Sequence, residues 1–174
     1  MRPIWELFVD GTDTPVAWVD FKPNRRFAIH NPGGTPGTSD DLVLDKETGL
    51  IWPRNPNTAG AAMNWLDANT TCRNFKLAHR IGWRLPTVEE LSSLMDTRNS
   101  NPSLPTGHPF VSVQFGDGVW AYWTSSNHEN PSASAWFVNF GSAGAGLADK
   151  GGNPPTLGFV WPVRGGRAGV NWNW

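Results

Sequence analysis

Short apolar runs separated by turn residues fill the first third of the chain, a pattern typical of strands joined by hairpins. Residues 4–9 and 16–21 are two predicted strands of one hairpin. Residues 42–44 and 50–52 are two predicted strands of a second hairpin, in which Gly49 suits a turn position with positive φ. The chain therefore begins with β-structure.

The apolar spacing changes in the middle of the chain to a helical period. Between residues 58 and 78, apolar residues recur at spacings of three and four, which predicts an amphipathic helix capped by Asn57 or Thr58. The apolar face consists of Ala61, Trp65, Ala68, Cys72 and Phe75. Thr87 and Glu90 form a capping box that predicts a second helix. We expect Trp65, Cys72 and Leu91 to lie in the core.

The second half of the chain combines loops with apolar strands. Residues 97–118 and the Gly-rich residues 141–158 are predicted loops. Apolar runs at 120–124, 135–140 and 159–163 are predicted strands. Strands, then two helices, then loops and strands indicate an α+β fold, because helices and strands are segregated along the chain.

Composition and charge exclude several functional classes. The formal net charge is −1 and no basic run occurs, so nucleic acid binding by phosphate neutralisation has little support. No apolar stretch approaches the roughly 20 residues that cross a bilayer, so no membrane insertion is expected. Cys72 is the single cysteine, which rules out an internal disulfide and indicates a small core residue. The 11 tryptophans indicate core anchors together with some exposed contact residues.

Five segments of the chain form a recognisable series: Leu44–Trp52 (LDKETGLIW), Gly82–Leu91 (GWRLPTVEEL), Tyr122–Ser126 (YWTSS), Ala135–Phe140 (AWFVNF) and Val163–Gly166 (VRGG). In this order they resemble the C-terminal domain family of the Legionella collagen-like protein, a bacterial domain family. The resemblance indicates a domain over residues 40–166, preceded by an N-terminal strand or hairpin arm over 1–39 that is continuous with it and followed by a tail over 167–174.

The resemblance implies a C-type-lectin-like fold, similar to the formylglycine-generating enzymes, with two helices packed on a twisted antiparallel sheet and a loop-rich second half. Members of the family are mostly bacterial and often exported or displayed at the cell surface, and the best-known ones are adhesins that recognise sulfated polysaccharides. The N-terminus lacks the apolar core of a signal peptide, so the chain either stays in the cell or has lost its export signal.

The resemblance therefore implies a non-catalytic, adhesin-like recognition domain whose partner is a carbohydrate, sulfated polysaccharides included, or a protein surface. The alternatives are a structural or assembly domain of a surface fibre or phage-like tip, and a degenerate formylglycine-generating enzyme. That enzyme chemistry depends on a pair of cysteines and this chain has only Cys72, so we expect no catalysis. The oligomeric state stays open.

The recurring motifs themselves are interpreted as structural. A five-donor guanidinium at Arg84 suits a hub that binds carbonyl groups of neighbouring loops better than it suits a ligand contact. Residues 123–126 and 164–166 are interpreted in the same way: these motifs recur in the family because its fold needs them.

The ligand is placed on loops of the second half, since binding residues concentrate on loops that a rigid scaffold holds. The candidate residues are Trp120, Asn127, His128, Glu129, Lys150 and Asn153.

No cofactor is expected, and calcium has no support from a lectin motif. Residues 129–131 read Glu-Asn-Pro, in the wrong order for a lectin calcium site, and no Trp-Asn-Asp string occurs. Oxygen ligands could still come from either of two sets of acids. These are Asp40, Asp41 and Asp45, or Asp117 and Asp149.

Overall fold

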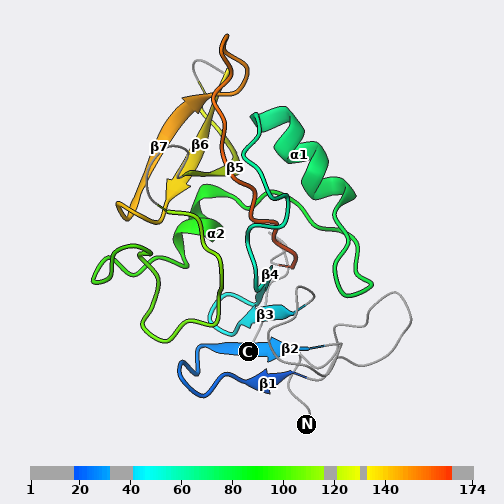
Figure 1. Ribbon diagram of the computed structural model, residues 1–174, viewed down its shortest axis with the longest axis vertical. Helices are drawn as coiled ribbons and strands as arrows, with labels where there is room; N and C mark the ends of the chain where they lie inside the picture. Colours follow the sequence, from blue (N-terminus) through cyan, green and yellow to red (C-terminus); the bar gives the residue numbers. More distant parts are fainter. Residues whose placement is uncertain (1–17, 32–40, 116–120, 130–132, 166–174) are drawn as a thin grey trace.

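The computed structural model describes residues 18–31, 41–115, 121–129 and 133–165, and shows two antiparallel sheets joined by long loops (Figure 1). The first sheet has four strands in sequence order: β1 (Val19–Asp20), β2 (Phe27–His30), β3 (Leu42–Asp45) and β4 (Leu50–Pro53). The second has three: β5 (Ala121–Asn127), β6 (Ser134–Asn139) and β7 (Gly144–Asp149). Between the sheets in sequence lie two helices, α1 (Trp65–Asn74) and α2 (Val88–Ser92).

The predicted C-type-lectin-like α+β fold, with two helices packed on one twisted sheet, is wrong. The described part of the chain is mostly β, its strands belong to two separate sheets, and its helices have only 10 and 5 residues. The helical period overestimated α1, because the helix begins only after the cap Asn64, whose side chain accepts a hydrogen bond from the Asp67 N–H. Ala61, assigned to the apolar face, is exposed outside the helix.

The Gly-rich segment after β6 is a strand instead of the predicted loop. Six residues of β7 pair with β6, from Ser134↔Asp149 to Asn139↔Gly144. The glycines serve packing here, since a Cβ on Gly146 would lie 2.7 Å from Cζ of Phe137. Glycines that indicate a loop when the sequence is read alone can therefore belong to a strand, where they leave room for an aromatic ring of the neighbouring strand.

The predicted second hairpin is confirmed as β3 and β4, with the register Asp45↔Leu50 and with Gly49 at φ 71°. The predicted first hairpin is only partly testable, because residues 4–9 lie outside the described part of the chain. Within the described residues, Val19 and Asp20 pair with Ile29 and Ala28 of β2, which in turn pairs with β3. The domain boundaries at residues 39/40 and 166/167 stay a prediction.

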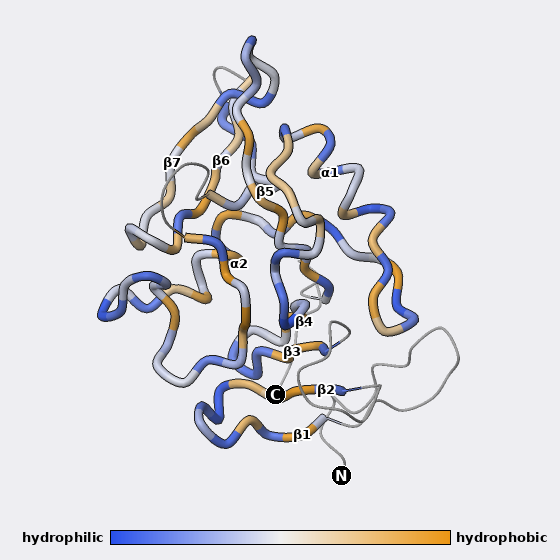
Figure 2. The backbone as a smooth tube through the Cα atoms, in the orientation of Figure 1, coloured by the Kyte–Doolittle hydropathy of each residue, from blue (hydrophilic) through white to orange (hydrophobic). Residues whose placement is uncertain are grey.

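Residues 158–164 connect the two halves through isolated bridges rather than as the predicted strand. Phe159 pairs with Tyr122 of β5, Val163 with Arg84, and Arg164 with Ile51 of β4. Trp161 lies between these bridges, fully buried, with ring centroids of Phe110, Tyr122 and Trp52 at 4.9, 5.4 and 5.7 Å. The main core therefore lies between the two sheets, and Figure 2 shows the apolar stretches of β2 and β3 that contribute to the interior.

The helices pack through the residues that the sequence indicated, with one exception. Cys72 of α1 and Leu91 of α2 are fully buried, as expected, whereas Trp65 is only partly buried. The capping box of α2 is confirmed, because Thr87 accepts from the Glu90 N–H while the Glu90 carboxylate accepts from the Thr87 N–H.

Candidate functional site

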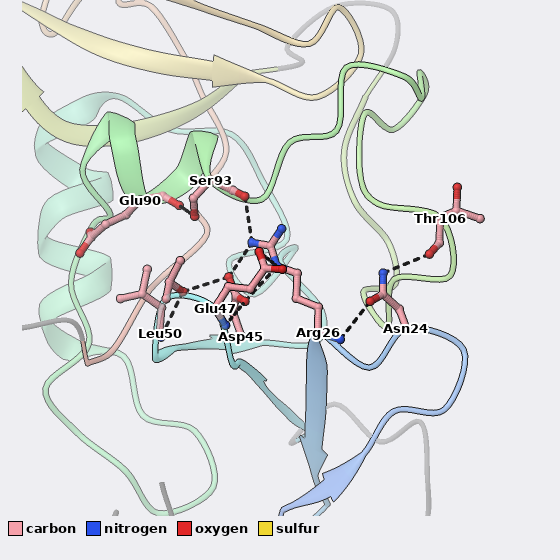
Figure 3. A network of polar contacts seen from close by, with 9 residues as sticks. Asn24, Arg26, Asp45, Glu47, Leu50, Glu90, Ser93 and Thr106 are labelled. Carbon is pink, nitrogen blue, oxygen red and sulfur yellow. Dashed lines mark hydrogen bonds and ion pairs between the residues drawn. The ribbon is translucent and has the colours of Figure 1, made fainter. Parts of the chain in front are cut away.

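A buried polar network joins the first sheet to α2 (Figure 3). The Asp45 carboxylate, fully buried, accepts from Nε and Nη2 of Arg26 at 2.9 and 2.6 Å, from the Glu47 N–H at 3.1 Å and from the Thr48 hydroxyl at 2.9 Å. Arg26 also donates to the Ser93 carbonyl at 2.9 Å. Burial alone would lower the pKa of Arg26, but the hydrogen bond and charge of Asp45 raise it above its ordinary value. The network accordingly holds the β3–β4 turn and the end of α2 together.

Arg84 acts as a structural hub in the described structure. Its two Nη atoms contact the two oxygens of Glu90 at 2.7 Å each, and they also donate to the carbonyls of Leu85 and Gly165 at 3.2 and 3.1 Å. The hydrogen bonds that Arg84 donates to the Glu90 carboxylate raise the pKa of Arg84. Gly165 has φ 86°, and a Cβ there would lie 3.1 Å from the Gly49 carbonyl oxygen. These contacts support the structural interpretation of the Trp-Arg-Leu-Pro and Arg-Gly-Gly motifs.

The Trp-Thr-Ser-Ser motif fastens β5 to its neighbours. The Thr124 hydroxyl donates to the Trp136 carbonyl at 2.7 Å, and Ser125 donates its N–H to the Pro86 carbonyl at 2.7 Å. The Ser126 hydroxyl accepts from the Val88 N–H at 3.0 Å, which satisfies a donor in the first turn of α2. The polar groups of this motif therefore form hydrogen bonds that stabilise the fold.

Five of the six predicted ligand residues lie at one end of the second sheet. Because β5 and β7 both run antiparallel to β6, their carboxyl ends meet at the same edge. Asn127 ends β5 and is followed by His128 and Glu129, while Lys150 directly follows β7 and leads to Asn153. We call residues 127–129 and 150–153 the loop end. Trp120 lies outside the described residues.

Backbone hydrogen bonds hold the two parts of the loop end side by side. The Lys150 N–H donates to the Ala133 carbonyl at 2.8 Å, and the His128 N–H donates to the Ser134 carbonyl at 3.1 Å. Glu129 and Asn153 are exposed. The structure thus brings the predicted loops together on the start of β6.

Trp65, which the sequence analysis assigned to the core, lies against the loop end. Its indole Nε1 donates to the Thr124 carbonyl at 2.8 Å, and Nζ of Lys150 lies 4.7 Å from the centroid of its ring. The ring packs against the buried cluster that contains Ala68, Cys72 and Ala135. The position of Trp65 at the start of a helix is one sequence signal for a contact outside the core, because a side chain in the first turn can extend beyond the helix. The sequence does not show which residues it contacts, since these come from β5 and from the residue after β7.

The two sets of acidic residues considered as calcium ligands differ in their burial and in their partners. Asp41 and Asp45 are buried and face Arg54 and Arg26 at 2.8 and 2.6 Å, which leaves them engaged with guanidinium groups. Asp149 is exposed and accepts from the Gly151 N–H at 3.0 Å, whereas Asp40 and Asp117 lie outside the described residues. In the described part of the chain, no group of three or more His, Cys, Asp or Glu residues is placed to hold a metal ion.

Cys72 has the environment of a core thiol. It is fully buried among Ala68, Trp123 and Ala135, and this burial raises its pKa to about 12. The protonated thiol therefore predominates at neutral pH, and the thiolate required for nucleophilic chemistry is disfavoured.

The comparisons with known proteins identify the chain at the level of a family. No curated protein matches it. No helix within the described ranges is long and apolar enough to cross a membrane. The model of the Lcl C-terminal domain family matches residues 41–164, which include both helices and β3 to β7, and this family suggests a surface protein. The chain belongs to the Lcl C-terminal domain family.

Proposed function

We propose that this domain is a non-catalytic recognition module that binds a carbohydrate at the loop end. The observation that carries the proposal is the convergence of two polar loops, one after β5 and one after β7, on a rigid three-stranded sheet. Binding residues concentrate on loops that such a scaffold positions. The adjoining indole of Trp65 adds the flat apolar surface on which sugar rings stack.

Membership of the Lcl C-terminal domain family supports display of the domain at a cell surface, where a glycan-binding adhesin acts. The proposal includes export of the protein and binding without a metal ion. A protein ligand would use the same polar and aromatic groups, and it is therefore an outcome that the experiment must distinguish.

A second candidate, an assembly role within a surface fibre, is favoured by the edge of the second sheet. Among the described residues β7 pairs only with β6, and Leu147 near its middle is 42% exposed. A free edge with an exposed leucine favours association of chains. Concentration-dependent self-association in sedimentation equilibrium, abolished by Leu147→Asp, would support this role.

The recognition function is tested on an array of neutral and sulfated glycans, probed with and without calcium. The variant Asn127→Ala/Glu129→Ala/Lys150→Ala should lose binding at least tenfold while its stability changes by less than about 0.5 kcal/mol per site. The matched control replaces Asp20, Asn74 and Lys76, which are exposed residues away from the loop end, by alanine. Binding that survives in the first variant moves the site elsewhere, and binding that requires calcium contradicts the metal-free proposal.

A further inference from the structure

The indole of Trp65 is fixed at the junction of three elements. It begins α1, its Nε1 donates to the Thr124 carbonyl in the middle of β5, and the residue after β7 lies over its ring. One hydrogen bond and the packing against the buried cluster that contains Ala68, Cys72 and Trp123 set the plane of the ring before any ligand binds. A preset aromatic plane lowers the entropy that binding costs.

Lys150 covers the ring of Trp65 in a way that a ligand could replace. Its ammonium lies 4.7 Å from the ring centroid, and its backbone N–H is anchored to the Ala133 carbonyl at 2.8 Å. Only the flexible side chain has to turn aside to open the ring. An ammonium that turns aside on this flexible chain can supply donors to hydroxyl groups of a ligand stacked on the indole.

The charge of the loop end argues for an uncharged ligand. Lys150 and His128 are accompanied by Glu129 and by the exposed Asp149, so the described loops carry no excess of positive charge. Because polyanions bind through uncompensated positive charge, a sulfated chain would gain little here.

We infer that Trp65 and Lys150 form a subsite for one neutral pyranose ring of an unsulfated oligosaccharide, with the ring stacked on the indole and the Lys150 ammonium bound to its hydroxyl groups. The inference rests on the proposed carbohydrate-binding function and narrows its ligand class. It also assigns Trp65, at the start of α1, to the same site as the loops of the second sheet.

The test is titration calorimetry of the full chain with four probes: cellohexaose, mannohexaose, chitohexaose and a heparin dodecasaccharide, each at 50 and 300 mM NaCl. We expect at least one neutral hexasaccharide to bind, with a Kd that changes less than twofold between the two salt concentrations. Trp65→Phe should weaken this binding at least tenfold, and Lys150→Met at least threefold. The matched control is Trp136→Phe, the same substitution on β6, where strand alternation directs the side chain to the face opposite Ala135 and Phe137.

The outcomes separate this inference from the proposed function. Binding of heparin alone, weakened more than tenfold by salt, would overturn the neutral ligand but not carbohydrate recognition. Neutral binding that Trp65→Phe leaves unchanged, in a variant with wild-type circular dichroism, would overturn the subsite alone. If none of the four probes binds, both the inference and the carbohydrate-binding proposal are wrong.

Discussion

Removal of the Arg26 guanidinium should destabilise the domain more than removal of any exposed arginine. The side chains of Arg26 and Asp45 are 13% and 0% exposed, and two hydrogen bonds of 2.9 and 2.6 Å join them. Arg26→Met keeps an unbranched apolar stem in the same space but leaves the Asp45 carboxylate without its cation. It also removes the donor to the Ser93 carbonyl, and with it a link between β2 and α2.

The structure sets the size of the expected effect. Removing one partner of a buried ion pair costs roughly 3–5 kcal/mol. Asp45 keeps the Glu47 N–H and the Thr48 hydroxyl as donors, so the lower end of about 3 kcal/mol applies. At roughly 2–4 °C per kcal/mol for a chain of this length, Tm should fall by about 6–12 °C.

The assay is urea unfolding and thermal unfolding of Arg26→Met, Asp45→Asn and the double variant. We expect the double variant to be more stable than the sum of the two single losses predicts, by about 1 kcal/mol or more, because the second substitution removes the stranded charge. Arg98→Met is the matched control, since its ion pair with Asp96 leaves the arginine 87% exposed, and it should leave the free energy of unfolding almost unchanged. Equal losses for Arg26→Met and Arg98→Met would refute the assignment of the network as a buried joint.

Two further changes test the core. Gly158→Ala places a Cβ 2.9 Å from Nε1 of Trp123 and 3.2 Å from the Ala121 carbonyl oxygen, so it should lower the free energy of unfolding by about 1–3 kcal/mol in urea, whereas Gly151→Ala, which meets nothing within 4 Å, should not. The pKa of Cys72 is raised in the folded state from its ordinary 9.0 to about 12, so the stability that the protonated thiol contributes is present below pH 9 and is lost as pH rises towards 12. Cys72→Ala should therefore flatten the fall of Tm in this window, and an unchanged slope would contradict the burial of the thiol.

Local signals predicted the parts of the fold that depend on neighbouring residues. The β3–β4 hairpin follows from a glycine at the one turn position with φ 71°, and the start of α2 follows from the reciprocal bonds of Thr87 and Glu90. Each requires only residues within five positions along the chain. Helical periodicity was less reliable. The helical spacing of apolar residues extends to positions before residue 64, but the helix itself begins only at Trp65.

The parts of the fold that were predicted wrongly depend on pairing between residues far apart in the sequence. β7 is a strand because β6 offers it six partners, and Phe137 leaves room only for a glycine at position 146. The division into two sheets depends on residues 158–164, which bridge β4, β5 and the segment around Arg84 instead of extending one sheet. An apolar run such as 159–163 has the same local pattern in either arrangement, so it could not distinguish two sheets from one.

The loop end combines both kinds of information, which explains why its residues were only partly found. Loops at the ends of aromatic strands are a local signal, and they led to Asn127, Glu129 and Lys150. Trp65 was assigned to the core because its spacing from Ala68 and Cys72 fits an apolar helical face, yet those two are buried and Trp65 is only partly so. The difference arises because the Thr124 carbonyl draws the indole nitrogen towards β5 while Lys150 reaches across from β7. A residue at the first turn of a helix can satisfy the helical period and still belong to a surface site, and its assignment requires knowledge of which strand ends the helix faces.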